Sequence, residues 1–521
     1  EKDMKYNKIL KSLTYGLIVT MGVGTMASCT DGFEEANRQG NRASADELGR
    51  DNYSTGSFFI QMQNNAFPEQ ENAYQMNEDL IGNYLGRYMT YANNGFSDKN
   101  FARFNAPNGW VRYPFRDALP KVTSAFKDIE RLTNKSGVTY AQALILKAQA
   151  LLRLTDMYGP LPIGEESNVN AYSTQEKVYK TLIANLNTAT DIIQPIIIAS
   201  ADAKANEEYD KVYGGKLSNW FKLANSLKLR MAIRMRFADP SYAKQVGEAA
   251  VQAGVITQNS ENCAITYVPN GQYKTSIEWG DSRACADIES YMTGYSDPRI
   301  SKYFKDTETK GARSVIGCLA GAAVGNKAIA GKLYSAANVE QSTRGVWLTA
   351  SEVTFCRAEG ALAGWSNMGG TVKSLYEQAI TLSFEQWGAA NVSAYLADNT
   401  SVQANYEDAA NGFGSNQTAV SNITIAWDDS ATDEVKLERL ITQKWIALFP
   451  DGQEGWNEIR RTGYPKVFPV AQSTSGYTIK VPNRIPFDSD ELINNRASYE
   501  EAVQMLGGAD NYATKMWWQK K

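Results

Sequence analysis

The chain has 521 residues, of which 43% are hydrophobic and 21% charged, and its formal net charge is −4. This is ordinary globular composition, and no Pro/Ser-rich linker divides the chain, so we expect one large domain. The acidic balance argues against a nucleic-acid partner, which needs clustered positive charge. Histidine is absent, which excludes Ser-His-Asp and Cys-His mechanisms and every histidine-ligated metal site.

The N-terminus has the pattern of a secretory signal peptide. A lysine-rich start precedes an apolar stretch over 13–23, which is shorter than the roughly 20 residues of a spanning helix. Small residues then precede Cys29, as in bacterial lipoprotein signals, although Met26 stands where that pattern has Leu. We expect acylation at Cys29; the alternative is an ordinary signal peptide with an incidental cysteine.

The region after Cys29 is polar and acidic, with Asp31, Glu34 and Glu35 close to the cysteine. Such acids resemble a surface-export signal of lipoproteins. The expected organisation is a signal peptide over 1–28, a flexible lipid tether over 29–45 and a folded domain over 46–521.

Helical periodicity dominates the chain from residue 141 onward. Apolar residues recur at helical spacing over about 141–155, 178–193, 217–231, 350–362, 372–380 and 432–449. The first segment ends near Tyr158-Gly159-Pro160, where Gly and Pro break a helix. Ser173 and Glu176 have the spacing of a capping box for the second. In the third, Arg230, Arg234 and Arg236 lie on or near the polar side.

Two of these segments form a predicted helix–turn–helix. A turn at Asn367-Met368-Gly369-Gly370 joins them, and the spacing from Ala350 to Trp387 is close to one tetratricopeptide repeat. The stretch from 257 to 347 is irregular and rich in Gly, Asn, Ser and Tyr. No run of alternating strands is long enough for a sandwich or barrel. We therefore predict an all-α, mainly helical fold with a few short strands in its loops.

Aromatic residues and asparagines are interleaved between 84 and 115. The aromatic residues are Tyr84, Tyr88, Tyr91, Phe96, Phe101, Phe104, Trp110, Tyr113 and Phe115, and the asparagines are Asn83, Asn93, Asn94, Asn100, Asn105 and Asn108. Gly and Asn favour a loop here. Flat aromatic faces stack on sugar rings or peptide planes, and Asn side chains both donate to and accept from hydroxyls. Most of the Phe residues should belong to the core.

We predict a ligand-binding face that draws on this loop and on the second irregular stretch. Its expected contacts are Tyr88, Asn93, Asn94, Trp110, Tyr273 and Trp279. Large, stiff aromatic side chains on loops of a rigid helical scaffold are suited to this role.

Other chemistry-bearing patterns are weak. Asp428, Asp429 and Asp433 form an acidic cluster without EF-hand spacing, so neither a metal nor a cofactor is predicted. Cys263, Cys285, Cys318 and Cys356 have no CxxC spacing and are expected to be buried thiols. Arg460-Arg461 is interpreted as structural, ordering a turn by bonding helix carbonyls. Chance pairs such as Glu407-Asp408 do not establish the two carboxylates that glycoside hydrolysis needs.

Several segments, in order, resemble the RagB/SusD family and its SusD-like nutrient-binding lipoprotein branch. They are 141–144 with the exit Tyr158-Gly159-Pro160-Leu161-Pro162, 351–365, Glu454-Gly455-Trp456-Asn457-Glu458-Ile459-Arg460-Arg461-Thr462-Gly463-Tyr464-Pro465, 484–487 and 508–518. The resemblance implies tetratricopeptide-type helix pairs with a loop-rich ligand face. It also implies an outer-membrane, surface-exposed protein that caps a SusC-like, TonB-dependent barrel and passes it oligosaccharides or peptides.

Two other classes of function stay open at this point. One is a surface glycoside hydrolase of helical-barrel type, for which no acid/base pair is identifiable. The other is a tetratricopeptide scaffold that binds only proteins. The loop rich in aromatic residues argues against this class. A binding protein without catalysis is the favoured interpretation.

Overall fold

Helices dominate the computed structural model, which describes residues 53–164, 170–309, 313–472 and 476–521. The longer α-helices are α4 (Tyr53–Ala66), α7 (Leu119–Leu132), α8 (Gly137–Tyr158), α9 (Gln175–Ala199), α10 (Leu217–Met235), α11 (Pro240–Ala253), α12 (Ala286–Gly294), α15 (Ala350–Leu362), α16 (Val372–Trp387), α18 (Asp433–Leu448), α19 (Gly452–Thr462) and α21 (Arg496–Leu506). The predicted mainly helical fold is confirmed.

The other helical segments are short. They are α5 (Glu71–Tyr74), α6 (Asn108–Val111), α13 (Ile300–Tyr303), α14 (Lys327–Leu333), α17 (Val392–Ala397) and α20 (Glu491–Asn494), the π-helical η2 (Gln75–Asn83), η5 (Pro114–Ala118) and η7 (Tyr273–Glu278), and the 3₁₀ turns η3 (Asn94–Phe96), η4 (Phe101–Arg103) and η6 (Asn259–Glu261). In the described ranges, two antiparallel pairs of short strands complete the fold: β1 (Met89–Tyr91) with β3 (Ser282–Ala284), and β2 (Cys263–Ile265) with β4 (Gly345–Leu348).

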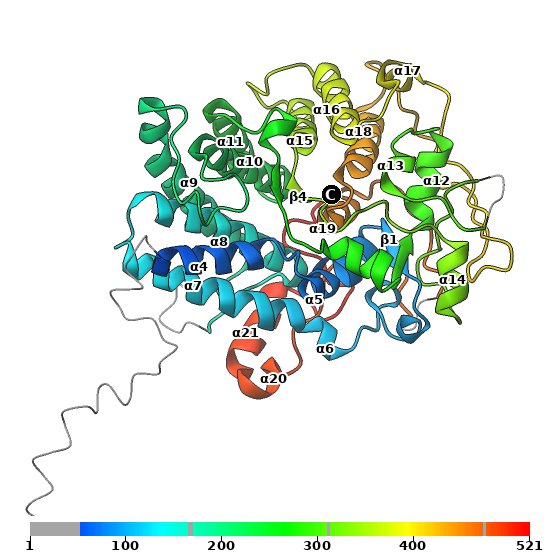
Figure 1. The fold of residues 1–521 in the computed structure, drawn as a ribbon, viewed down its shortest axis with the longest axis horizontal. Coiled ribbons are helices and arrows are strands. Elements are labelled where there is room, and N and C mark those ends of the chain that lie inside the picture. The colour runs from blue at the N-terminus through cyan, green and yellow to red at the C-terminus, as the bar shows by residue number, and fades with distance from the viewer. Residues whose placement is uncertain (1–52, 165–169, 310–312, 473–475) are drawn as a thin grey trace, which may run out of the picture. The chain divides into compact units, whose positions relative to one another are not determined.

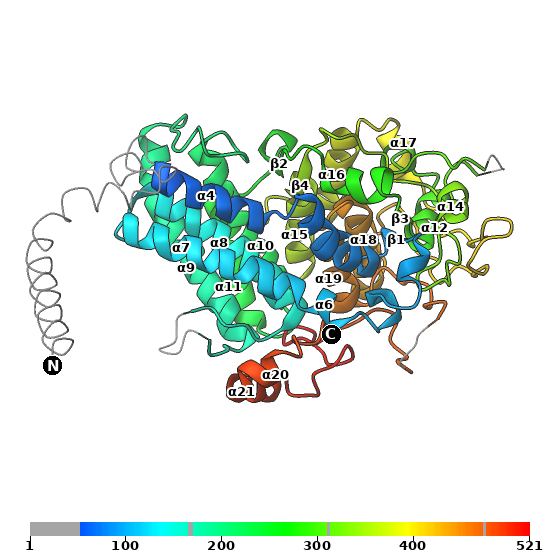
Figure 2. The ribbon, with the colours of Figure 1, turned by 60° about the horizontal axis from the view of Figure 1, so that its bottom comes forward.

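Helices that follow one another in the chain pack as pairs. α8 packs on α9, α10 on α11 and α15 on α16; α18 packs on the last of these pairs, and α19 packs on α18 and on η2. Both ribbon views place α8 to α11 in one half of the folded part, α15, α16 and α18 in the middle, and the strand pair β1–β3 with α12 and α14 in the other half (Figures 1 and 2). The predicted hairpin over 350–387 is confirmed, and the loop-rich half lies beside the helix pairs.

Threonine side chains set several helix starts. Thr174, Thr349, Thr371 and Thr432 are the N-caps of α9, α15, α16 and α18, and each hydroxyl accepts a bond from a backbone N–H of the first turn. The predicted capping box at Ser173 is therefore wrong by one residue. Ser173 instead forms a backbone bridge with Leu161, one residue before the N-cap.

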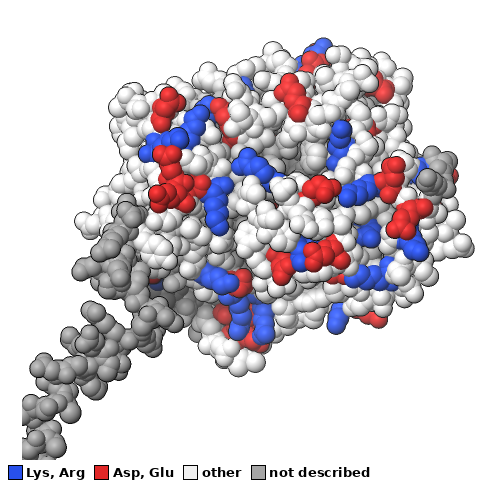
Figure 3. Space-filling view, viewed as in Figure 1, with Lys and Arg blue, Asp and Glu red and all other residues white. Residues whose placement is uncertain are grey.

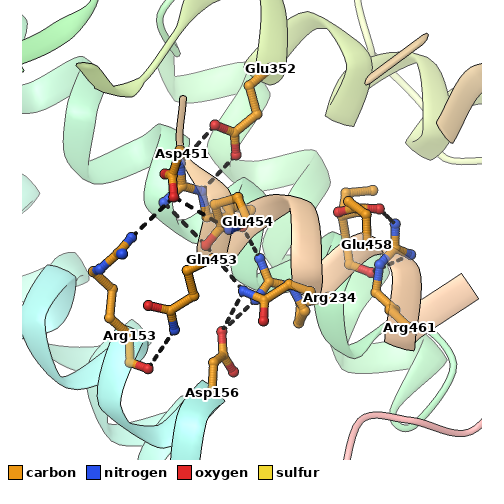
Figure 4. Close-up of polar contacts among 12 residues, drawn as sticks. Arg153, Asp156, Arg234, Glu352, Asp451, Gln453, Glu454, Glu458 and Arg461 are labelled. Atoms are coloured by element: carbon orange, nitrogen blue, oxygen red, sulfur yellow. Dashed lines mark hydrogen bonds and ion pairs between the residues drawn. The ribbon is translucent and has the colours of Figure 1, made fainter. Parts of the chain in front are cut away.

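The polar side of α10 faces the interior, contrary to the usual expectation for charged residues. Arg230 and Arg234 are 2% and 1% exposed. Arg230 donates to both carboxylate oxygens of Glu352 on α15, each at 2.7 Å. Arg234 bonds Asp156 of α8 and Glu454 of α19. Figure 4 shows Asp156, Arg234, Glu352 and Glu454 converging where α8, α10, α15 and α19 meet.

A second pair of contacts extends this buried ionic cluster along α19. Arg461 donates to Glu359 at 2.6 and 2.8 Å and also pairs with Glu458. Arg460 bonds the backbone carbonyl of Asp156, in the last turn of α8. The structural interpretation of Arg460-Arg461 is confirmed, since both side chains are buried between helices.

The four cysteines of the described residues are free and buried. Cys285 and Cys318 belong to neighbouring backbone segments joined by a bridge, yet no disulfide links them. The prediction of scattered buried thiols is confirmed.

Candidate ligand-binding face

Strand pairing brings the two predicted ligand-binding segments together. β1 pairs with β3 so that Tyr91 lies opposite Ser282, and the backbone N–H of Ala92 extends the ladder to the carbonyl of Asp281 at 2.7 Å. The loop that follows β1 and the π-helix that precedes β3 therefore lie at the same edge, although nearly 200 residues separate them in the chain. This edge lies in the loop-rich half, where β1 is labelled in Figure 1.

Asp281 holds the loops of this edge in place. Its carboxylate accepts from Asn93 Nδ2 at 2.8 Å, from Lys327 Nζ at 2.5 Å and from Gln75 Nε2 at 3.1 Å. The side chain of Asp281 is buried, and its three donors come from three different segments. Asn93 is consequently a positioning residue: its amide donates to Asp281, and its carbonyl oxygen accepts from the N–H of Gly95 at 2.8 Å.

Aromatic side chains surround this anchored edge. Phe96 and Trp110 meet edge to face with ring centroids 5.2 Å apart. Trp279 lies two residues before Asp281, with the ammonium of Lys274 over its ring at 5.4 Å. The half-buried Phe96, Trp110, Tyr273 and Trp279, together with the exposed Asn94, are called the aromatic face below.

Tyr88 does not belong to the aromatic face. Its side chain is 0% exposed, its hydroxyl donates to the carbonyl of Trp445, and its ring packs on that of Trp445 at 5.3 Å. Gly455 of α19 makes room for it, because a Cβ there would lie 2.7 Å from the Tyr88 hydroxyl. The prediction of Tyr88 as a ligand contact is therefore wrong; the residue joins the loop to the helical core.

Most of the predicted asparagines hold the loop rather than face solvent. Asn100 accepts from the N–H of Arg103 at 2.9 Å, Asn105 donates to the carbonyl of Asp98, and Asn108 donates to Asp488 at 3.0 Å. The Phe residues behave as expected, since Phe101, Phe104 and Phe115 are buried. Asn94 is the asparagine of this loop that is best exposed for a ligand.

Three contributors to this edge were missed at the level of sequence. Gln75, Asp281 and Lys327 are single polar residues in separate segments, and no spacing marks them. Phe96 was assigned to no particular role. Only the β1–β3 pairing makes their relation visible.

Charged side chains are mixed on the side of the molecule shown in Figure 3. Acidic and basic residues are interspersed there, and neither sign gathers in one patch. Among the described residues there is no group of acids and cysteines that could hold a metal ion. The acidic cluster at 428–433 serves local structure, since Asp428 accepts from the hydroxyl of Ser430 at 2.6 Å.

The chain is similar to several solved SusD homologues. A SusD-like protein from Bacteroides thetaiotaomicron is 34% identical with a TM-score of 0.85, over 90% of this chain and 99% of that one. A SusD homologue from Bacteroides uniformis is 35% identical, with the same TM-score, over 90% and 100%. A chitin-binding SusD homologue from Flavobacterium johnsoniae is 36% identical with a TM-score of 0.83, over 89% and 98%.

No match was found among curated proteins. Residues 35–519, however, match the family model described as "SusD-like: Susd and RagB outer membrane lipoprotein". With nearly the whole chain matched by the model and by the solved relatives, the chain belongs to the SusD-like family of outer membrane lipoproteins.

Proposed function

We propose that this protein binds oligosaccharides at the cell surface on its aromatic face. The observation that supports this most is that β1–β3 pairing brings the segment of Asn94 and Phe96 to the same edge as the segment of Trp279, while Trp110 packs on Phe96. Half-buried rings offer flat apolar area to a sugar, and the exposed Asn94 offers a donor and an acceptor to its hydroxyls. Because the rings are already held by packing, little side-chain freedom is lost when a ligand binds.

N-acetylglucosamine oligosaccharides are the first ligands to test. The warrant is the chitin-binding relative, which is 36% identical over nearly its whole length. An acetamido group brings a methyl for the aromatic rings and an amide for Asn94. A peptide is the alternative ligand, since amide planes also stack on Trp and Tyr.

The protein is further proposed to deliver its ligand to a SusC-like, TonB-dependent barrel. Acylation at Cys29 would anchor it in the outer membrane, with residues 1–28 removed and 29–45 acting as a tether; these residues lie outside the described ranges. A subunit that covers a barrel mouth needs an interface above the ~1,600 Å² of a standard complex.

Binding without catalysis is the proposed mode of action. The aromatic face contains amide and aromatic groups, and the carboxylate of Asp281 at its edge is already occupied by Asn93, Lys327 and Gln75. The runner-up function, a surface glycoside hydrolase, needs two free carboxylates flanking the bond. Release of shorter sugars from a bound oligosaccharide, abolished by one carboxylate substitution, would favour the hydrolase instead.

Calorimetric titration of the full chain carrying Cys29→Ala with chitotetraose tests the binding proposal. Trp279→Ala and Trp110→Ala should each weaken binding roughly thirtyfold, because truncation of a central stacking residue costs about 2 kcal/mol or more. Trp427→Ala is the matched control, since Trp427 is also half-buried but packs on Tyr376, with ring centroids 5.0 Å apart.

If both tryptophan variants and the control bind chitotetraose as tightly as the wild type, with unchanged melting curves, the aromatic face is not the binding site. A parallel titration with mixed tetrapeptides separates the glycan from the peptide alternative. The partner is tested by affinity purification from native outer membranes in mild detergent. Recovery of the protein without a large barrel would contradict delivery to a transporter.

A further inference from the structure

A separate cavity of about 190 Å³ lies between the helix pairs and the loop-rich half. Its walls are aromatic: Trp347 of β4, Trp387 at the end of α16, Phe449 and Tyr74 line it. Phe449 and Trp387 are fixed by Tyr303, whose ring lies 4.4 and 4.6 Å from theirs. The volume is far above what one water needs and below the roughly 300–1,000 Å³ of pockets for drug-sized ligands.

Buried polar atoms without partners line the same cavity. Among the described residues, Gln272 Nε2 and the indole N–H of Trp387 have no hydrogen-bond acceptor. Glu69 also lines the cavity, and its carboxyl group interacts with the Trp347 indole and the backbone of Gly271. Gln272, Trp347 and Glu69 are 5%, 3% and 3% exposed. Leaving such groups unpaired is unfavourable, so their grouping around one space indicates that something polar fills it.

The backbone is shaped to keep Glu69 at this position. β4 passes directly over its carboxylate at Gly345, where a Cβ would lie 1.6 Å from Glu69 Oε1. Burial raises the pKa of Glu69 to about 7, against smaller opposing effects of the Gly271 N–H and the nearby Trp347 indole. The exposed Asn338, Thr343 and Arg344 form the outer rim.

The cavity floor is rigid because it is shared with the buried ionic cluster. Asp451, the N-cap of α19, lines the cavity and accepts from Arg153 at 3.3 Å. Arg153 also stacks on the Trp347 ring at 4.7 Å. Figure 4 shows Arg153 and Asp451 directed toward each other at the junction of α8 and α19.

We infer that this cavity is a second binding site, which takes a single pyranose-sized sugar unit. An uncharged polyol supplies what the walls lack: hydroxyl oxygens for Gln272 and the Trp387 indole N–H, and a hydroxyl proton for Glu69. A cation would satisfy Glu69 but leave the two donors unpaired, and an anion would be repelled by the carboxylates of Glu69 and Asp451. The inference rests on the proposed glycan-binding function and adds a site to it.

The test uses monosaccharides, which are too small to need the aromatic face. Saturation-transfer NMR and calorimetry are run on the full chain carrying Cys29→Ala and Trp279→Ala, with N-acetylglucosamine, glucose, galactose, mannose and xylose as probes. At least one should bind. Gln272→Leu keeps about the same size and removes one donor, and Trp387→Phe keeps an aromatic ring but removes the indole N–H; each should weaken that binding about tenfold.

The same variants distinguish a binding role from a structural one. Gln272→Leu, which removes an unpaired buried donor at nearly constant size, should leave the melting temperature unchanged or raise it, because the empty site leaves this polar group without a partner. A fall in melting temperature with unchanged sugar affinity would overturn the inference. So would binding of choline, a probe for aromatic cation sites, without binding of any sugar.

Failure of the inference is separable from failure of the proposed function. If no monosaccharide binds while chitotetraose binds to the chain with Trp279 intact, the cavity holds water only and the aromatic face stands. If chitotetraose fails as well, both are overturned.

Discussion

Replacing Arg230 by Met should destabilise the fold strongly, because Arg230 is the buried charge that joins α10 to α15. Its side chain is 2% exposed, and it donates twice to Glu352 and once to the carbonyl of Trp347 at 2.8 Å. Met preserves much of the apolar volume and removes the charge. Glu352, itself 3% exposed, would then lose its main partner, and breaking a buried pair in this way costs about 3–5 kcal/mol.

The loss should also depend on pH. Burial raises the pKa of Glu352, and Arg230 is the main group that opposes this rise. Without Arg230 the folded-state pKa moves further above the unfolded value of 4.5. A folded pKa raised above the unfolded one means that stability is lost as pH rises. The variant should therefore be closer to the wild type at pH 5 than at pH 8.

Urea denaturation of wild type, Arg230→Met and Arg230→Met with Glu352→Gln measures the effect. The double variant should recover part of the loss, since it no longer buries an unpaired carboxylate. Arg496→Met is the matched control, because Arg496 pairs with Glu500 at 2.7 Å on the surface, and its midpoint should not move. Equal midpoints for Arg230→Met and Arg496→Met would refute this account of the buried ionic cluster.

Three further predictions address the cavity, the loop and the anchor. Glu69→Gln should remove a pH-dependent loss of stability. The pKa of Glu69 is about 7 in the folded protein against 4.5 in the unfolded chain, so its ionisation destabilises the wild type as pH rises from 4.5 to 7, by about 3 kcal/mol at most. Urea midpoints measured across that pH range test this. Tyr88→Ala should lower the free energy of unfolding by about 3–5 kcal/mol. Melting curves and glycan titrations of the folded variant test this, and a change in glycan affinity without a change in stability would contradict the core position of Tyr88. Cys29→Ala should abolish fatty-acid labelling and membrane association, whereas persistent label would point to another attachment site.

The helical scaffold was predictable because a helix that packs on the core repeats apolar residues at helical spacing in the sequence. The segments at 141–155 and 217–231 repeat apolar residues at helical spacing, and these became α8 and α10. The buried charges left no such trace: Arg230 and Arg234 occupy the polar side of their helix, which by itself predicts solvent. Only the acids of α8, α15 and α19 make their burial possible, and those lie up to 220 residues away.

The candidate site was predictable in composition but not in detail. Aromatic residues and asparagines indicated the two loop regions, and β1–β3 pairing brings those regions together. Sequence could not tell the packed Tyr88 from the half-buried Trp110, because both stand in the same Asn-rich stretch. The cavity was missed entirely, since Glu69, Gln272, Trp347 and Trp387 share no motif and meet only in the folded chain.

The anchoring of Asp281 has an evolutionary consequence. Its three partners fix the course of the loops, whereas Asn94, Trp110 and Trp279 take no part in these bonds. Selection could therefore exchange the projecting side chains, and with them the nutrient that is captured, without disturbing the joints that hold the loops. Paralogues arising by gene duplication would then differ in the nutrient that they bind, while their backbones stayed superimposable.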